Sequence, residues 1–146
     1  MRDIDKAKQL LSQGGYTCVL CRGGTVYTST LRGVTPVVEW LDAGTDLRGF
    51  SAADKVIGKA AAMLFVLAGV GEVYAPVMTG TAKDILTHRG IRNSCDTITG
   101  SIINRAGTGP CPMERAVKEI EEPALALEAV KQTLLRLKNE TQEAGN

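Results

Sequence analysis

The sequence is poor in aromatic residues and carries almost no net charge. Aromatic side chains account for 4% of its 146 residues, and the formal net charge is +1. Proteins that bind nucleic acid present basic patches and aromatic side chains on which bases stack. Because this chain has little of either, the composition argues against a nucleic-acid partner, while a homo-oligomer is compatible with it.

Histidine is equally scarce, since His88 is the only one in the sequence. It lies in "LTHRG", near the end of a predicted helix, where a positive side chain interacts favourably with the helix dipole. We therefore expect a structural role for His88, and without it no Ser-His-Asp triad can be assembled.

The sequence also lacks a long hydrophobic run. Its longest apolar segment, "AAAMLFVLAGV", is much shorter than the roughly 20 residues that a membrane-spanning helix needs. The first residues, "MRDIDKAKQLLSQGG", have the pattern of a short amphipathic helix and not that of a signal peptide. We expect a cytoplasmic protein with no membrane partner.

Four cysteines are present, but they do not form the pattern of a metal site. Cys18 and Cys21 have CxxC spacing inside the strand-like segment "YTCVLC", and residues three apart on a strand point to opposite faces. A zinc site needs a second pair at comparable spacing, whereas Cys95 and Cys111 are widely separated. We expect no metal and no cofactor, two buried strand thiols, and, in the cytoplasm, no disulfide.

What the sequence does contain is an alternation of strand and helix patterns. Apolar periodicity, glycine turns and β-branched runs predict the elements in chain order. They are a helix over 3–13, a hairpin of "YTCVLC" and "TVYTST" around 22–24, a helix over 35–43, a strand in "EVYAPVM", a helix in "TGTAKDILTHRG", a strand in "IRNSCDT", and a helical segment from 100 onward, broken at 107–110 and at 123. This alternation indicates an α/β fold, namely a three-layer α/β/α sandwich on a mixed sheet in which two strands form a hairpin and the others are parallel.

The length suits a single domain over 1–146. We expect a core over 1–120, followed over 121–146 by a C-terminal helix and a frayed tail.

The segment "FSAADKVIGKAAAMLFVLAGVG" carries an unusual charge pattern. Ser51 and Asp54 have the spacing of a capping box, which predicts a helix from Ala52 to Ala68. On that helix Lys55 and Lys59 would be neighbours on one face, at the end where the dipole favours anions. The rest of the helix is almost wholly apolar, so the two lysines do not belong to a long solvated stripe.

Two interpretations of this helix end remain open. In the first, backbone N–H groups and the two ammonium groups hold a phosphate or carboxylate, or one lysine with a lowered pKa serves as base or nucleophile. Gly58 would then let the ligand approach the backbone closely. In the second, Asp54 only caps the helix, the lysines extend to the surface, and Gly58 permits close helix packing.

A second candidate cluster lies in "NRAGTGPCPMER". Proline favours the first helical position, which would make Cys111 the N-cap residue and Glu114 the third helical residue. A thiol at a helix N-terminus typically has a lowered pKa, which favours reactivity. Asn104 and Arg105 add a donor and a fixed positive charge suited to an anionic substrate. The alternative is a buried structural cysteine beside an ordinary turn.

The segments "SAADKVIGKAAAM", "GEVYAPVMT" and "INRAGTGPCPMER" resemble the bacterial family called domain of unknown function 1893, over about residues 3–119. This resemblance implies a cytidine-deaminase-like core, with helices on both faces of a mixed sheet. Zinc deaminases carry H-x-E or C-x-E at the start of the central helix and P-C-x-x-C at the next. Here these positions are 53–55 and 79–81, which lack both motifs, and Glu114 follows Cys111 where a second cysteine would stand. The resemblance therefore implies the fold without the zinc site.

The residues leave four hypotheses about function open. The first is a metal-free enzyme acting on a small anionic or nucleotide-like ligand, in which Cys111 is the nucleophile or redox centre, Lys55 a base or charge partner, and Asp54 an orienting group. Its ligand-binding residues would be Lys59, Gly58, Ser51, Asn104, Arg105 and Glu114. The second is a non-catalytic metabolite-binding or regulatory domain, and the third is a purely structural protein. The fourth is a zinc deaminase, which fails if the purified protein contains no stoichiometric zinc.

Overall fold

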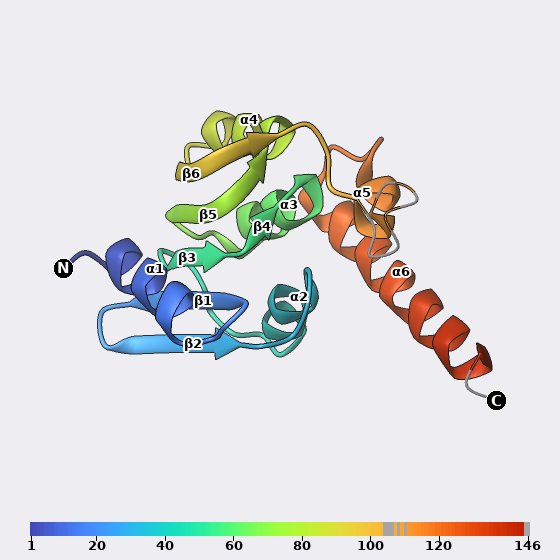
Figure 1. Ribbon diagram of the computed structural model, residues 1–146, viewed down its shortest axis with the longest axis horizontal. Helices are drawn as coiled ribbons and strands as arrows, with labels where there is room; N and C mark the ends of the chain where they lie inside the picture. Colours follow the sequence, from blue (N-terminus) through green and yellow to red (C-terminus); the bar gives the residue numbers. More distant parts are fainter. Residues whose placement is uncertain (104–106, 108, 110, 145–146) are drawn as a thin grey trace.

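The computed structural model describes residues 1–103, 107, 109 and 111–144, and it shows a mixed α/β protein (Figure 1). A six-stranded mixed sheet is flanked by helices. The elements in chain order are α1 (Asp3–Gln13), β1 (Cys18–Arg22), β2 (Thr25–Ser29), α2 (Thr35–Asp42), β3 (Ser51–Asp54), β4 (Val56–Ile57), α3 (Lys59–Ala68), β5 (Glu72–Thr79), α4 (Gly80–His88), β6 (Arg92–Thr99), α5 (Pro112–Val117) and α6 (Pro123–Ala144).

The sheet combines an antiparallel hairpin with a parallel half. β1 pairs antiparallel with β2 on one side and with β3 on the other. β3 and β4 both run parallel along the same side of β5, and β6 runs parallel along its other side. The predicted hairpin and the predicted parallel strands are therefore confirmed.

Pro76 explains why β3 and β4 are separate strands. β3 pairs with the first part of β5 and β4 with a later part, and the residue offset between partners is the same in both. Lys55, between the two strands, falls opposite Pro76 in this register. Proline has no backbone N–H, so the ladder is interrupted at this level of the sheet.

Helices cover the two faces unequally. α1 packs on one face, where Ile4, Ala7 and Leu11 form a small apolar cluster with strand residues. The larger core lies on the other face, beneath α3 and α4, and includes Phe65, Leu64, Ile57, Met78 and Leu86. Since α3 is apolar nearly all round and also contacts α2, α5 and α6, most of its surface is buried, as its sequence predicts. Figure 1 shows α6 extending from this side, away from the sheet.

The predicted helix start at Ala52 is wrong. Residues Ser51–Asp54 form β3, all four are buried, and the central helix begins at Lys59 with Gly58 as its N-cap. The S-x-x-D spacing is a local signal, whereas β3 hydrogen-bonds to strands on both sides. Pairing of a buried segment on two edges outweighs a capping preference of about 1 kcal/mol. Ser51 and Asp54 therefore cap no helix.

The C-terminal prediction is correct in part. α5 begins at Pro112 with Cys111 as N-cap and Glu114 as its third residue, and α6 begins at the predicted break. Residues 100–103, however, are not helical. The N-terminal helix, β5, α4 and β6 lie where the sequence places them, and α2 has Val34 as its N-cap, one residue before the predicted Thr35.

Candidate functional site

The carboxylate of Glu114 caps helix α3 from another part of the chain. Its Oε1 accepts a hydrogen bond from the backbone N–H of Lys59 at 2.7 Å, and its Oε2 accepts one from Ala60 at 2.8 Å. A negative group at this position satisfies two otherwise unpaired donors and interacts favourably with the helix dipole. Glu114 thus supplies a negative group from within the protein at the start of α3.

Gly58 makes this contact sterically feasible. A Cβ atom on Gly58 would overlap Oε1 of Glu114 and would also press on the side chain of Ile102. The group that lies against Gly58 is the Glu114 carboxylate, and not a ligand or another backbone as considered from the sequence. A second tie joins the same elements, because Nζ of Lys59 donates to the backbone oxygen of Lys118 at 2.9 Å.

Asp54 lies elsewhere, inside the sheet. It is 6% exposed and sits directly opposite Cys18 of the neighbouring strand, so the two side chains share one face. Its Oδ1 accepts a hydrogen bond from the backbone N–H of Lys55 at 2.8 Å. Burial raises the pKa of Asp54 to about 8, an effect that this hydrogen bond only partly opposes. Burial, reinforced by the negative charge of Asp54, also raises the pKa of the Cys18 thiol well above its usual value.

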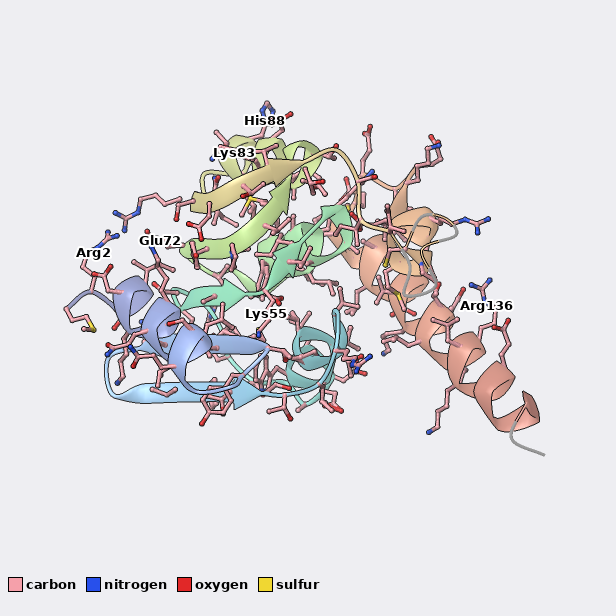
Figure 2. All side chains as sticks on the ribbon, in the orientation of Figure 1. Arg2, Lys55, Glu72, Lys83, His88 and Arg136 are labelled. Carbon is pink, nitrogen blue, oxygen red and sulfur yellow. The ribbon has the colours of Figure 1, made fainter. Side chains whose placement is uncertain are left out.

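The two lysines singled out in the sequence are not neighbours. Lys55 is exposed at the break between β3 and β4, whereas Lys59 lies in the first turn of α3. Figure 2 shows Lys55 near the end of β3, away from α5. The prediction that they share one helix face is wrong, because no helix spans both.

The other predicted residues are scattered. Ser51 is buried at the start of β3, opposite Cys21 and Glu72, and thus at the end of the strand that lies away from the first turn of α3. Cys111 is half-buried, packs against the main core, and donates its backbone N–H to the oxygen of Ile102 at 2.9 Å. Asn104 and Arg105 lie outside the described residues. The structure therefore brings together Gly58, Lys59 and Glu114 and separates them from Ser51, Asp54 and Lys55.

A cavity of about 520 Å³ opens beside the capped helix end, and we call it the strand-end cavity. It lies at the carboxyl ends of β5 and β6, the edge where open α/β sheets bind ligands. Its lining residues are Lys59, Thr79, Thr81, Gly100, Ser101, Ile102, Glu114, Arg115 and Lys118. Three of these side chains are cationic, and the single carboxylate, Glu114, already accepts two backbone hydrogen bonds.

Most of this lining was not found from the sequence. Thr79 ends β5 and, as the N-cap of α4, accepts a hydrogen bond from the backbone N–H of Ala82 at 3.1 Å. Its position between a buried strand and a helix was a usable signal. No sequence signal pointed to Arg115 or Lys118, because these residues reach the cavity only through the docking of α5.

Neither a metal centre nor a membrane span is found in the described part of the chain. No three histidine, cysteine, aspartate or glutamate side chains among those residues gather as metal ligands would. No helix within the same residues is long and apolar enough to cross a bilayer.

The fold and the strand-end cavity define a mixed α/β protein with a cationic cavity at the carboxyl edge of its parallel strands. The sequence model of the domain of unknown function DUF1893 matches residues 6–134, and the chain belongs to this family. The family resemblance seen in the sequence is confirmed. The structure is also similar to the crystal structure of a DUF1893 family protein from Thermotoga maritima, with a TM-score of 0.79 and 24% identity over 92% of this chain and 89% of that one. At this identity the likeness shows a shared fold. No protein of curated function matches the sequence.

Proposed function

We propose that this protein binds a small anionic metabolite, a phosphate ester or a carboxylate, in the strand-end cavity. The observation that carries this proposal is the grouping of Lys59, Arg115 and Lys118 around one cavity whose single carboxylate is already engaged. Hydroxyl groups of Thr79, Thr81 and Ser101 line the same space. Charged donors beside hydroxyls are the groups that bind phosphate and carboxylate oxygens.

We further infer that the fold is cytidine-deaminase-like. This is supported by a hairpin followed by parallel strands, with α1 on one face and α3 and α4 on the other. In zinc deaminases the central helix begins with the metal ligand. Here that helix begins with Gly58 and Lys59, neither of which suits zinc, and Glu114 accepts hydrogen bonds from its backbone. The residues present do not fit a zinc centre, so zinc deamination is not the activity that we propose.

Binding without catalysis is the function that the geometry favours. Lys55 is exposed away from the cavity and Asp54 is buried beside Cys18, so neither supports the catalytic roles considered for them. One observation favours a metal-free enzyme as second candidate: the backbone N–H of Cys111 bonds to Ile102, which lines the cavity. In that candidate the Cys111 thiolate would be the nucleophile.

Inorganic phosphate is the first probe of the proposal. We expect a phosphate-dependent rise in melting temperature and a saturable isotherm by calorimetry. Arg115→Ala should weaken phosphate binding by about tenfold or more, since a hydrogen bond to a charged group contributes roughly 1.5–3 kcal/mol. Lys55→Ala is the matched control, because it removes an exposed cation outside the cavity. No binding by the wild type, or equal binding by both variants, would overturn the proposal.

A further inference from the structure

A second cavity adjoins the strand-end cavity. It has a volume of about 490 Å³ and is lined by residues of α3, of α4 and of the connection between α5 and α6. Lys59 and Thr81 line both cavities. The two spaces therefore meet at these side chains, and we call the second one the helix crevice.

The walls of the helix crevice follow from helical periodicity. Lys59, Met63 and Val66 lie on one face of α3, and on α4 the spacing of Thr81, Ile85 and His88 also places them on one face. Met63 on α3 lies one turn beyond Lys59, and Ile85 on α4 lies one turn beyond Thr81. The apolar part of the crevice therefore begins at the same level on both helices. Ile120 adds an apolar side chain from the connection before α6.

The connection between α5 and α6 forms the third side of the helix crevice, and two cationic side chains donate hydrogen bonds to it. Lys59 donates to the backbone oxygen of Lys118 at 2.9 Å, and Nη2 of Arg89 donates to that of Glu121 at 3.4 Å. The α5–α6 connection is thereby tied to α3 at one point and to α4 at another. The crevice lies between these ties, so it is bounded on three sides.

The apolar walls are incompletely covered by the protein. Val66, Ile85 and Ile120 each pack against the main core yet remain only half-buried, because their other sides face the helix crevice. A ligand body that covers them would remove apolar surface from water. Apart from Lys59, the polar residues that line the crevice stand at exposed positions, namely Thr81, Asp84, His88, Arg89 and Glu121.

We propose that the ligand is amphiphilic, with its anionic group in the strand-end cavity and an apolar body in the helix crevice. This inference rests on the proposed function, because the anionic group is held by the same residues, Arg115 and Lys118. It adds the substrate class: an organic phosphate or carboxylate whose acidic group ends a chain or ring of apolar character. The bound ligand would extend past Lys59 and Thr81, where the two cavities meet.

The test is a homologous series of alkyl phosphates measured by calorimetry on the full chain. Inorganic phosphate, ethyl, butyl and hexyl phosphate share the anionic group and differ in apolar length. We expect affinity to increase by about twofold to fourfold for each methylene that enters the crevice. Hexanol, which lacks the anion, should bind more weakly than hexyl phosphate.

A crevice-filling variant locates the effect. Ile85→Trp should abolish the advantage of hexyl phosphate over inorganic phosphate and leave binding of inorganic phosphate unchanged. Leu135→Trp, at a position on α6 that is 60% exposed, is the matched control and should keep the full advantage. Ile120→Phe is a second filling variant with the same expected direction, and melting curves without ligand confirm that each variant folds.

The outcomes separate the inference from the proposed function. Phosphate binding that depends on Arg115, together with affinity that does not change from ethyl to hexyl phosphate, overturns the amphiphilic ligand and leaves the anion site standing. A chain-length effect that survives both filling variants also overturns it, because the apolar body would then lie elsewhere. Absence of binding by the whole series overturns both proposals.

Discussion

Oε1 of Glu114 occupies the space in which a side chain on Gly58 would begin. The two residues are far apart in the sequence. Because Gly58 has no Cβ, the carboxylate of Glu114 can reach the first turn of α3. The start of the central helix, the first turn of α5 and one wall of the strand-end cavity meet at this contact.

Gly58→Ala should destabilise the fold. The new Cβ would displace Glu114 and weaken its two hydrogen bonds to α3, at a cost of about 1–3 kcal/mol. Urea unfolding at neutral pH measures this cost as a change in the free energy of unfolding. Gly24→Ala is the control, because a Cβ there meets no neighbouring atom and the backbone is not left-handed. An equal effect of both substitutions would contradict the assignment.

Glu114→Ala should also destabilise the fold, by about 1–2 kcal/mol, because it leaves two helix donors without their acceptor. In this background Gly58→Ala should cost less than in the wild type, since the carboxylate that it displaces is gone. A double-mutant cycle measures the coupling free energy. Glu119→Ala, which removes an exposed carboxylate from the end of the same segment, should change stability little. Additive effects of Gly58→Ala and Glu114→Ala would show that the two residues do not interact.

Asp54 should make stability depend on pH. Its folded pKa of about 8 lies above the value near 3.9 expected for an unfolded aspartate, so the folded state retains the proton longer. The contribution of the protonated carboxyl is complete below the unfolded pKa and is lost as pH rises from about 4 through 8. Asp54→Asn removes this titration, so it should gain stability relative to the wild type by a few kcal/mol over that range.

Urea unfolding of both proteins between pH 4 and pH 9 measures the difference. Asp84→Asn, which changes an exposed carboxylate outside the sheet, is the control substitution. A wild-type stability that does not fall between pH 4 and pH 8 relative to Asp54→Asn would refute the buried, protonated carboxyl.

Iodoacetamide should distinguish the four thiols. Cys18 and Cys21 are buried, and burial raises the pKa of each, so both should resist labelling in the native protein. Cys95 and Cys111 are half-buried and should be modified. Peptide mapping by mass spectrometry at neutral pH gives the order. If Cys111 is a nucleophile it should be labelled first, and labelling of Cys95 before Cys111 would remove the enzyme candidate.

The sequence predicted best those elements whose signals are local. Apolar periodicity placed the helix over 3–13, glycine placed the hairpin turn, and Pro112 placed Cys111 and Glu114 in α5. The same kind of signal failed at Ser51–Asp54, because two neighbouring strands, distant in the sequence, decide its conformation.

Of the candidate residues named from the sequence, Lys59 and Glu114 line the strand-end cavity. Gly58 was expected inside a helix that starts at Ala52, whereas it is the N-cap of α3, in contact with Glu114. Glu114 reaches the start of α3 only because α5 packs there. The hydrogen bond from Lys59 to Glu114 spans 55 residues, so no local sequence pattern predicts it. Arg115 and Lys118 were missed for the same reason.

The cap of α3 has a consequence for the order of events during synthesis. The first turn of this helix leaves the ribosome long before Glu114 does, since 55 residues separate Lys59 from its acceptor. Until Glu114 has emerged, the backbone N–H groups of Lys59 and Ala60 lack this acceptor, and the strand-end cavity lacks its α5 wall. The docking of α5 therefore completes both the cap of α3 and one wall of the strand-end cavity.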